Sequence, residues 1–322
     1  MRAITIDSTG GPDVLTLADL PEPEPGPADL LVRVEAAGVN FIDTYHRSGL
    51  YPVDLPFVPG QEGAGRVVAA GPGVTGFTPG DLVAWSDVAG SYAELARVPA
   101  ARAVPVPDGV RAEQAAAVLL QGMTAHFLTH DTYPLRPGHR CLVHAAAGGV
   151  GLLLVQLAKD AGAQVFATAG SAEKAELARA AGADHVVLYR EEDFGDVIEA
   201  IAGPRPLDVV FDGVGRATFA RGLDLLRPRG TMVTFGNASG AVDPVAPLTL
   251  MAKGSLSLTR PTLHDYVATT DELRARAGAV LGLVAAGALA VRVGERLPLA
   301  QARQAHELLE GRGTTGKILL LP

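Results

Sequence analysis

Short apolar segments alternate with amphipathic ones between residues 141 and 235, and this alternation constrains the fold more than any other feature of the chain. The apolar segments are expected to be strands at 141–145, 163–168, 185–189, 207–212 and 231–235. Continuous apolar strands that alternate with helices are typical of a parallel sheet buried on both faces. The repeat of strand, helix and strand, roughly every twenty residues, predicts a doubly wound Rossmann sheet.

The first of these strands leads directly into a glycine-rich turn, 144-HAAAGGVGLL-153. Ala146, Gly148 and Gly151 occupy the three small positions of a G/A-x-G-x-x-G turn. A side chain at Gly148 would hold a pyrophosphate away from the backbone, and one at Gly151 would push the next helix off the strand. This strand–turn–helix context predicts a dinucleotide site, in which free N–H groups at a helix N-terminus bind the phosphates.

The end of the second strand bears on which dinucleotide is bound. An NAD site usually places Asp or Glu there, to accept from the ribose 2′-hydroxyl. Here 168-TAGSAEK-174 offers no carboxylate at the strand end, and Ser171 and Lys174 open the next helix. A hydroxyl and an ammonium suit a 2′-phosphate, so NADPH is expected. The alternative for Lys174 alone is a solvated helix lysine without a ligand.

The first third of the chain has a different pattern. Short β segments are expected at 30–36, 65–70, 81–85 and 92–96. Gly, Pro and Asp separate them at short intervals, as in a barrel-like, mainly antiparallel domain. An alanine-rich helix is expected at 112–120. Past the parallel-sheet region, a strand at 291–293, a helix at about 300–310 and a strand at 317–321 are expected to rejoin the first domain.

Composition sets outer limits on the class of protein. A chain of 322 residues exceeds one comfortable core, which favours two domains. A net charge of −8 without clustered Lys and Arg argues against nucleic acid as a primary partner. The single cysteine, Cys141, excludes an intramolecular disulfide and a four-cysteine zinc lobe, and it is expected to be an inert core thiol.

The single cysteine and the N-terminal sequence favour a cytoplasmic protein without membrane insertion. The N-terminal segment lacks the apolar region of a signal peptide. The longest uncharged apolar stretch, 277–291, is too short to span a bilayer.

A resemblance to a known protein family covers essentially the whole chain. The sequence resembles the medium-chain dehydrogenase/reductase superfamily, in its zinc-independent quinone oxidoreductase (zeta-crystallin-like) branch. The segments that carry the resemblance are 38-GVNFIDTYHRSGLYP-52, 58-VPGQEGAGRV-67, 121-QGMTAHFL-128, 144-HAAAGGVGLL-153, 187-VLYREEDF-194, 211-FDGVG-215, 235-FGNASG-240 and 257-SLTRP-261. It implies a GroES-like catalytic domain at 1–120 and 289–322, flanking a Rossmann NADP-binding domain at 121–288.

The resemblance also implies site residues. Beside the nicotinamide it places Asn40, Phe41, Tyr45 and Thr124, with Phe235, Gly236, Asn237 and Ser239 closing over it and Arg260 and Lys317 close by. It places Gly148, Gly149 and Val150 at the pyrophosphate, and Gly170, Ser171, Lys174 and Tyr189 around the 2′-phosphate. Asn40, Tyr45 and Tyr51 are the catalytic-side candidates, in positioning or substrate-lining roles without an assigned acid or base. His144 is expected to be a satisfied core residue, although its position would allow it to reach the cofactor.

No metal is expected. Zinc-bearing relatives carry Cys where this chain has Asn40, and a His-Glu pair where it has Gln61 and Glu62. Catalytic zinc takes thiolate, imidazole or carboxylate ligands, and an amide is a poor substitute. The segment 59-PGQEGAG-65 is therefore interpreted as a tight turn into a strand, held by hydrogen bonds of Gln61 and Glu62.

The expected function is an NADPH-dependent, zinc-independent reductase that passes a hydride or electrons to a quinone. An NADPH-dependent 2-alkenal or enone reductase is the nearest alternative. A cofactor-binding protein with a structural or RNA-binding role is the alternative from another class. The resemblance also implies a homodimer, formed through the Rossmann sheet edge around residues 231–239.

Overall fold

The computed structural model describes residues 1–322, and these divide into two compact units. Unit 1 comprises Met1–Met123 and Val267–Pro322, and unit 2 comprises Thr124–Tyr266. None of the helices combines the length and apolarity that a bilayer crossing needs.

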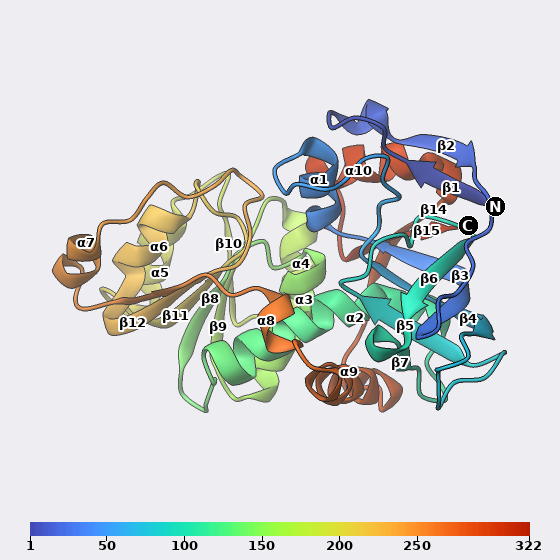
Figure 1. The fold of residues 1–322 in the computed structure, drawn as a ribbon. Coiled ribbons are helices and arrows are strands. Elements are labelled where there is room, and N and C mark those ends of the chain that lie inside the picture. The colour runs from blue at the N-terminus through green and yellow to red at the C-terminus, as the bar shows by residue number, and fades with distance from the viewer. The chain divides into compact units, whose positions relative to one another are not determined.

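Unit 2 is built on a six-stranded parallel sheet with the order β10-β9-β8-β11-β12-β13 (Figure 1). The strands are β8 (Arg140–Val143), β9 (Gln164–Ala169), β10 (His185–Leu188), β11 (Leu207–Asp212), β12 (Leu226–Thr234) and β13 (Ser257–Thr259). Every residue of β11 is buried, as expected for a strand covered on both faces. This sheet confirms the predicted doubly wound fold, with the chain order reversing beside β8.

Helices cover both faces of this sheet. Figure 1 shows α3 (Gly149–Asp160) and α4 (Ala172–Ala180) on one face, and α5 (Phe194–Ala202) and α6 (Phe219–Leu225) on the other. Leu142, Phe166 and Val210 from three strands lie in one buried cluster with Ile198 of α5. Shorter helical segments of the unit are η3 (Leu128–Thr132), α7 (Pro247–Ala252) and α8 (Leu263–Tyr266).

The edge of this sheet differs from the expected one. β13 is a three-residue strand that the sequence pattern did not predict, and it pairs in parallel with β12. β12 therefore lies inside the sheet, between β11 and β13. The expectation that residues 231–239 form the edge is wrong, because β13 forms the edge on this side of the sheet and β10 forms the other.

Unit 1 contains a seven-stranded sheet with the order β14-β15-β3-β4-β5-β7, and β6 pairs with β3. All its pairs are antiparallel except β14 with β15, which confirms the mainly antiparallel prediction. The strands are β3 (Asp29–Val39), β4 (Glu62–Ala70), β5 (Leu82–Ser86), β6 (Leu95–Pro99), β7 (Val104–Pro105), β14 (Val293–Pro298) and β15 (Lys317–Leu321), beside a separate hairpin of β1 (Arg2–Thr5) and β2 (Thr16–Asp19).

Alternation within β3 shows how the sequence builds the core of unit 1. Leu30, Val32 and Val34 are buried on one face, while Arg33 and Glu35, which alternate with them, are exposed. The predicted return of the C-terminal region is seen directly, because β15 pairs with β3. The helical segments are α1 (Phe41–Ser48), α2 (Ala112–Phe127), α9 (Thr270–Ala285), α10 (Ala302–Glu310), η1 (Pro12–Val14), η2 (Ala100–Arg102) and η4 (Leu299–Gln301), with α2 continuing into unit 2.

The boundary after unit 2 lies earlier than the expected residue 288. Helix α9 belongs to unit 1, because its side chains pack there. The Arg274 guanidinium donates to Ala100 O (3.3 Å) and lies 5.7 Å above the Phe77 ring. A Cβ built at Gly122 would lie 2.6 Å from Val280 of α9, so these two helices approach closely.

Candidate active site

The glycine-rich turn of unit 2 has the geometry of a phosphate cradle. Gly148 precedes α3 in an extended conformation and has no side chain to cap the helix, so the first N–H groups of α3 lack intrahelical partners. A Cβ at Gly151 would lie 2.4 Å from Ala145 O, which excludes any side chain there. Gly148, Gly149 and Val150 are partly exposed and hence accessible to an anion.

Two buried polar atoms at the carboxyl end of this sheet have no hydrogen-bond partner. They are Nε2 of His144, just after β8, and Oγ1 of Thr234, the last residue of β12. His144 Nδ1 is engaged by Thr168 Oγ1 at 3.0 Å, so only half of the imidazole is satisfied. Burial lowers the pKa of His144, which keeps the ring neutral. Ligands of open α/β sheets bind at this end of the strands, and unpaired polar atoms there fit a dinucleotide.

The residues predicted for the adenosine end lie together at the start of α4 and the end of β10. Ser171 is the N-cap of α4, and its Oγ accepts from Lys174 N (3.4 Å). A Cβ at Gly170 would lie 2.9 Å from the hydroxyl of Tyr189, which is 38% exposed. Glycine at 170 thus leaves room for the tyrosine, and both residues border the exposed start of the helix.

A second cation at this end was not predicted as a site residue. Partial burial lowers the pKa of Lys174, and the nearby charge of Arg190 lowers it further. Two neighbouring cations repel each other unless an anion lies between them, so this arrangement suits a phosphate group. Arg190 directly follows Tyr189 in sequence, and that adjacency was the only available signal.

The loop after β12 is held by its own side chains. Ser239 Oγ donates to Val214 O (2.8 Å) and accepts from Ala217 N (3.0 Å). Arg260 Nη1 donates to Gly236 O (3.2 Å), and a Cβ at Gly236 would meet Gly213 O at 2.3 Å. Ser239 and Arg260 therefore shape this loop, and the roles predicted for Phe235 and Asn237 toward a cofactor stay predictions. The same holds for Thr124 on α2.

In unit 1, the amide of Asn40 is fully engaged by a buried ion pair. Its Nδ2 donates to Glu62 Oε2 (2.9 Å) and Gly38 O (3.1 Å), and its Oδ1 accepts from Lys317 Nζ (2.7 Å). Lys317 Nζ lies 2.5 Å from Glu62 Oε2, and Glu62 Oε1 accepts from Leu120 N (2.7 Å). Lys317 is thus committed to Glu62 and Asn40, and the Asn40 amide has no hydrogen left to donate.

Aromatic side chains from α1 and the following turn form a partly exposed cluster. The rings of Tyr45 and Tyr51 meet edge to face at 5.3 Å, and Phe41 lies 6.4 Å from Tyr45. Tyr51 is 37% exposed, which agrees with a lining role. His46 contacts this cluster, and its partial burial lowers its pKa.

Gln61 offers a side-chain amide, which is a poor metal ligand. Gln61 N donates to Asp43 Oδ1 (3.1 Å), and its side-chain Nε2 lies 3.5 Å from His46 Nδ1. The structure contains no group of three or more His, Cys, Asp or Glu side chains arranged to hold a metal ion. Cys141 is fully buried, and burial raises its pKa to about 12.

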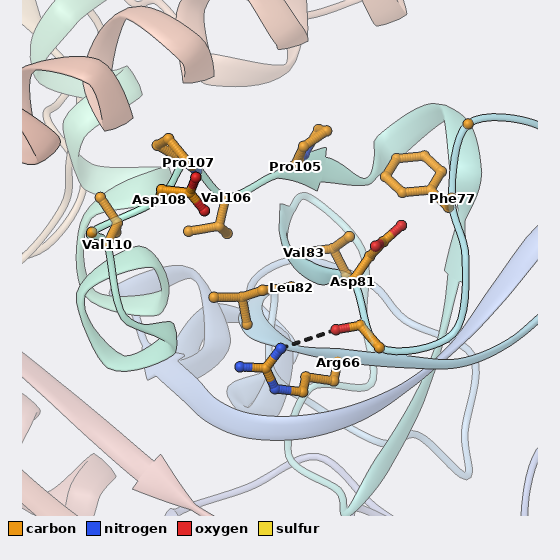
Figure 2. A pocket seen from close by; sticks show the side chains of 13 residues that line it. Arg66, Phe77, Asp81, Leu82, Val83, Pro105, Val106, Pro107, Asp108 and Val110 are labelled. Carbon is orange, nitrogen blue, oxygen red and sulfur yellow. Dashed lines mark hydrogen bonds between the residues drawn. The ribbon is translucent and has the colours of Figure 1, made fainter.

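A separate hollow of about 550 Å³ lies in unit 1 (Figure 2). It is lined by β5, the loop that precedes β5 and the segment 105–110, and Arg66 Nη1 donates to Gly80 O (2.9 Å) at its border. None of the predicted site residues lines this hollow. The candidate site therefore does not include it.

A doubly wound sheet with a phosphate cradle, inserted between two parts of an antiparallel domain, defines a dinucleotide-dependent oxidoreductase. Two family models match the chain: the alcohol dehydrogenase GroES-like domain over residues 26–108, and zinc-binding dehydrogenase over 149–273. The match over 26–108 confirms the GroES-like domain of the predicted fold.

Curated relatives and solved structures match over the full length. A quinone oxidoreductase of Pseudomonas aeruginosa is 45% identical, covering 100% of this chain and 99% of the relative. A 2-haloacrylate reductase of a Burkholderia species is 39% identical, covering 100% and 99%. The crystal structure of Escherichia coli quinone oxidoreductase complexed with NADPH has a TM-score of 0.97 at 43% identity, and all of both chains is covered. The chain belongs to the quinone oxidoreductase branch of the medium-chain dehydrogenase/reductase superfamily.

Proposed function

We propose that this protein is an NADPH-dependent, zinc-independent quinone reductase. The observation that carries the proposal is a phosphate cradle closed to any side chain at Gly151, in a chain similar over its full length to quinone oxidoreductases. Unit 2 is the NADP-binding domain in this proposal, and unit 1 is the catalytic domain.

The chain's own residues divide the work of binding the cofactor. The backbone at Gly148, Gly149 and Val150 holds the pyrophosphate through N–H groups that α3 leaves unpaired. Lys174 and Arg190 neutralise the 2′-phosphate, with Ser171, Gly170 and Tyr189 at its border. His144 Nε2 and Thr234 Oγ1, which are buried without a hydrogen-bond partner, would hydrogen-bond to the bound cofactor.

On the substrate side, we assign positioning roles. When bound, NADPH would supply a hydride, or single electrons, to the electron-poor ring of the quinone. Tyr45 and Tyr51 offer aromatic faces and edges to the flat ring of a quinone. Such a ring binds well against apolar walls and aromatic side chains. Reduction places negative charge on the quinone oxygens, and water protonates them, so the site needs no strongly tuned acid. Asn40, with its amide hydrogens engaged, acts by fixing the start of α1.

The absence of a zinc requirement is part of the proposal. An amide that is hydrogen-bonded to an ammonium and a carboxylate, as at Asn40, does not offer the thiolate that zinc favours. Gln61 likewise presents an amide at the position where zinc-bearing relatives carry histidine. Metal analysis of the purified protein that finds stoichiometric zinc would overturn this part.

A second candidate is reduction of a conjugated carbonyl. The similarity to a 2-haloacrylate reductase favours it, because that relative is named for an activated alkene with a carboxylate. The same fold and cofactor cradle serve both reactions. A cofactor-binding protein without turnover is the remaining alternative.

A steady-state assay separates these readings. NADPH and NADH oxidation are compared over a panel of naphthoquinones, ortho-quinones, 2-alkenals and 2-haloacrylate. We expect turnover with quinones and a preference for NADPH. Turnover confined to alkenals or haloacrylate supports the second candidate, and NADPH binding without oxidation across the panel supports a non-enzymatic role.

The proposed partner is a second copy of the chain. β13 offers a free sheet edge, and Leu248 and Met251 of α7 are 70% and 62% exposed. Free edges and exposed apolar side chains favour pairing with an equivalent surface. Light scattering is expected to report a dimer, and the double variant Leu248→Glu with Met251→Glu is expected to be a monomer.

The proposed location is the cytoplasm, because a single buried thiol fits a reducing compartment.

A further inference from the structure

A chain of buried hydrogen bonds in unit 1 connects the surface of α10 to the start of α1. The Arg47 guanidinium forms a two-pronged pair with Glu310, at 3.0 and 2.8 Å. Its Nη1 also lies 3.2 Å from His306 Nδ1. His306 Nε2 lies 3.2 Å from the Tyr92 hydroxyl, which lies 3.0 Å from Asp43 Oδ2. Asp43, Tyr92 and His306 are completely buried, and Arg47 is 3% exposed.

Every bond in this chain has a defined direction. Arginine is always a donor, so His306 Nδ1 must accept from Arg47. The neutral imidazole then carries its proton on Nε2 and donates it to the Tyr92 oxygen. The hydroxyl hydrogen of Tyr92 is left for Asp43. A pKa of His306 lowered to about 3 by burial, and by Arg47, agrees with the neutral ring.

The end of the chain, Asp43, joins two segments of the candidate site. Its Oδ2 accepts from the backbone N–H of Asn40 (2.8 Å), and its Oδ1 accepts from that of Gln61 (3.1 Å), 18 residues away. One carboxylate thus fixes the start of the helix that carries Tyr45 relative to the turn that leads to Glu62. Tyr92 N also donates to Pro59 O (3.1 Å), so the relay and the turn share a support.

We propose that Arg47, His306, Tyr92 and Asp43 form a directional hydrogen-bond relay in which Asp43 is the positioning residue of the quinone side of the site. The inference rests on the proposed function and adds positioning residues that lie outside the phosphate-binding segments of unit 2. The relay keeps Asp43 an acceptor, because only a carboxylate accepts from Asn40, Gln61 and Tyr92 together. A protonated Asp43 loses part of this set and releases the turn.

The charge state of Asp43 makes the relay testable. Burial raises its pKa to about 6, and the hydrogen bonds from Asn40 and Tyr92 hold that value down. The other titratable or charged groups around it are His306 and Glu310 of α10, Lys317 of β15, Glu62 of β4, and Arg47 and His46 of α1. Removing the Tyr92 hydroxyl therefore raises the pKa of Asp43.

The test compares the wild-type protein with Tyr92→Phe and with Tyr133→Phe, the same chemical change at a half-buried tyrosine of unit 2. kcat/KM for a naphthoquinone is measured between about pH 5 and 9, together with the NADPH Kd. We expect an acid limb near pH 6 in the wild type. In Tyr92→Phe this limb moves up by about one pH unit, with the Kd for NADPH unchanged. Tyr133→Phe leaves the profile in place.

Further readouts keep the proposal separate from the proposed function. The carboxyl ¹³C resonance of Asp43 is titrated in the wild type and in Tyr92→Phe, and the same upward shift is expected without turnover. If Tyr92→Phe does not fold, His306→Gln replaces it, with a smaller shift in the same direction. The relay is overturned if the wild type is active but its kcat/KM shows no acid limb near pH 6. It is also overturned if a folded variant leaves both that limb and the titration midpoint of Asp43 unmoved. An inactive wild type with a shifted midpoint contradicts the proposed function alone.

Discussion

Lys317 Nζ lies 2.5 Å from Glu62 Oε2, although the two residues are 255 positions apart in the chain. Their side chains are 1% and 0% exposed, so solvent does not screen the pair. Removing one partner of a buried ion pair strands the other charge, which is far more costly than exchanging both.

We expect Glu62→Gln to lower the free energy of unfolding by about 3–5 kcal/mol, because it leaves the Lys317 ammonium buried without a counter-charge. The double variant Glu62→Gln with Lys317→Met should recover much of that loss. Urea unfolding gives both values. The exposed pair Arg296–Glu113 is the control, and Glu113→Gln should cost at most about 1 kcal/mol. A similarly small cost for Glu62→Gln would mean that the buried pair is not isolated from water.

Gly151→Ala should weaken NADPH binding and destabilise the protein by about 1–3 kcal/mol, because the new methyl group would press on Ala145 O. Gly278→Ala is the control, since a Cβ there meets nothing within 4 Å in helix α9. That change should stabilise by about 0.5–1 kcal/mol. Thermal unfolding and NADPH titration measure the two effects, and equal behaviour of the two variants would contradict the close approach.

Lys174→Ala and Arg190→Ala should each raise the Kd for NADPH about tenfold, while the Kd for NADH stays unchanged. Only NADPH carries the 2′-phosphate that these cations are proposed to contact. Arg179→Ala, at the far end of α4, should alter neither value. Fluorescence titration with both cofactors checks this, and an equal loss of affinity for both would remove the 2′-phosphate assignment.

The buried His306 should make the protein less stable in acid. Its pKa is about 3 in the folded protein, against an ordinary value of 6.5. The unfolded chain therefore binds a proton that the folded chain does not, and stability is lost as the pH falls below 6.5. At about pH 4.5 the contribution of His306 alone amounts to a loss of about 2–3 kcal/mol. The raised pKa of Asp43 acts in the opposite direction over the same range.

His306→Gln removes this titration. The variant should be less stable than the wild type at neutral pH, because it loses hydrogen bonds, yet its stability should fall less between neutral pH and about pH 4.5. Urea unfolding at both values measures the difference. Parallel pH dependences of the two proteins would show that His306 is protonated in the folded state as readily as in the unfolded one.

Local patterns were sufficient to predict the architecture. Continuous apolar strands such as β11 predicted the parallel sheet, and the spacing of Ala146, Gly148 and Gly151 located the cradle, because both depend on neighbours in sequence. β13 was missed because three residues are too few to show a period. The end of unit 2 was placed too late, because the alanine- and glycine-rich α9 carries no signal for the unit it packs against.

The site was less accessible to sequence reasoning, since its contacts are distant in the chain. The segment around Glu62 predicted a tight turn, yet nothing local indicated that Lys317 would neutralise its carboxylate. The path from Arg47 through His306 and Tyr92 to Asp43 joins three separate parts of the chain, each unremarkable in its own surroundings. Arg190 was overlooked for a different reason: its neighbour Lys174 is close only after β9 and β10 have paired.

The placement of β15 between β3 and β14 has a consequence for synthesis of the protein. During translation, β3 leaves the ribosome early, but its sheet partner in residues 317–321 follows only after every strand of unit 2. Unit 2 can therefore fold on the nascent chain, whereas unit 1 must wait with an open sheet edge and an unneutralised Glu62. A chaperone that guards nascent chains would find its substrate in the N-terminal segment of this protein, and ribosomal pausing before residue 317 would lengthen that exposure.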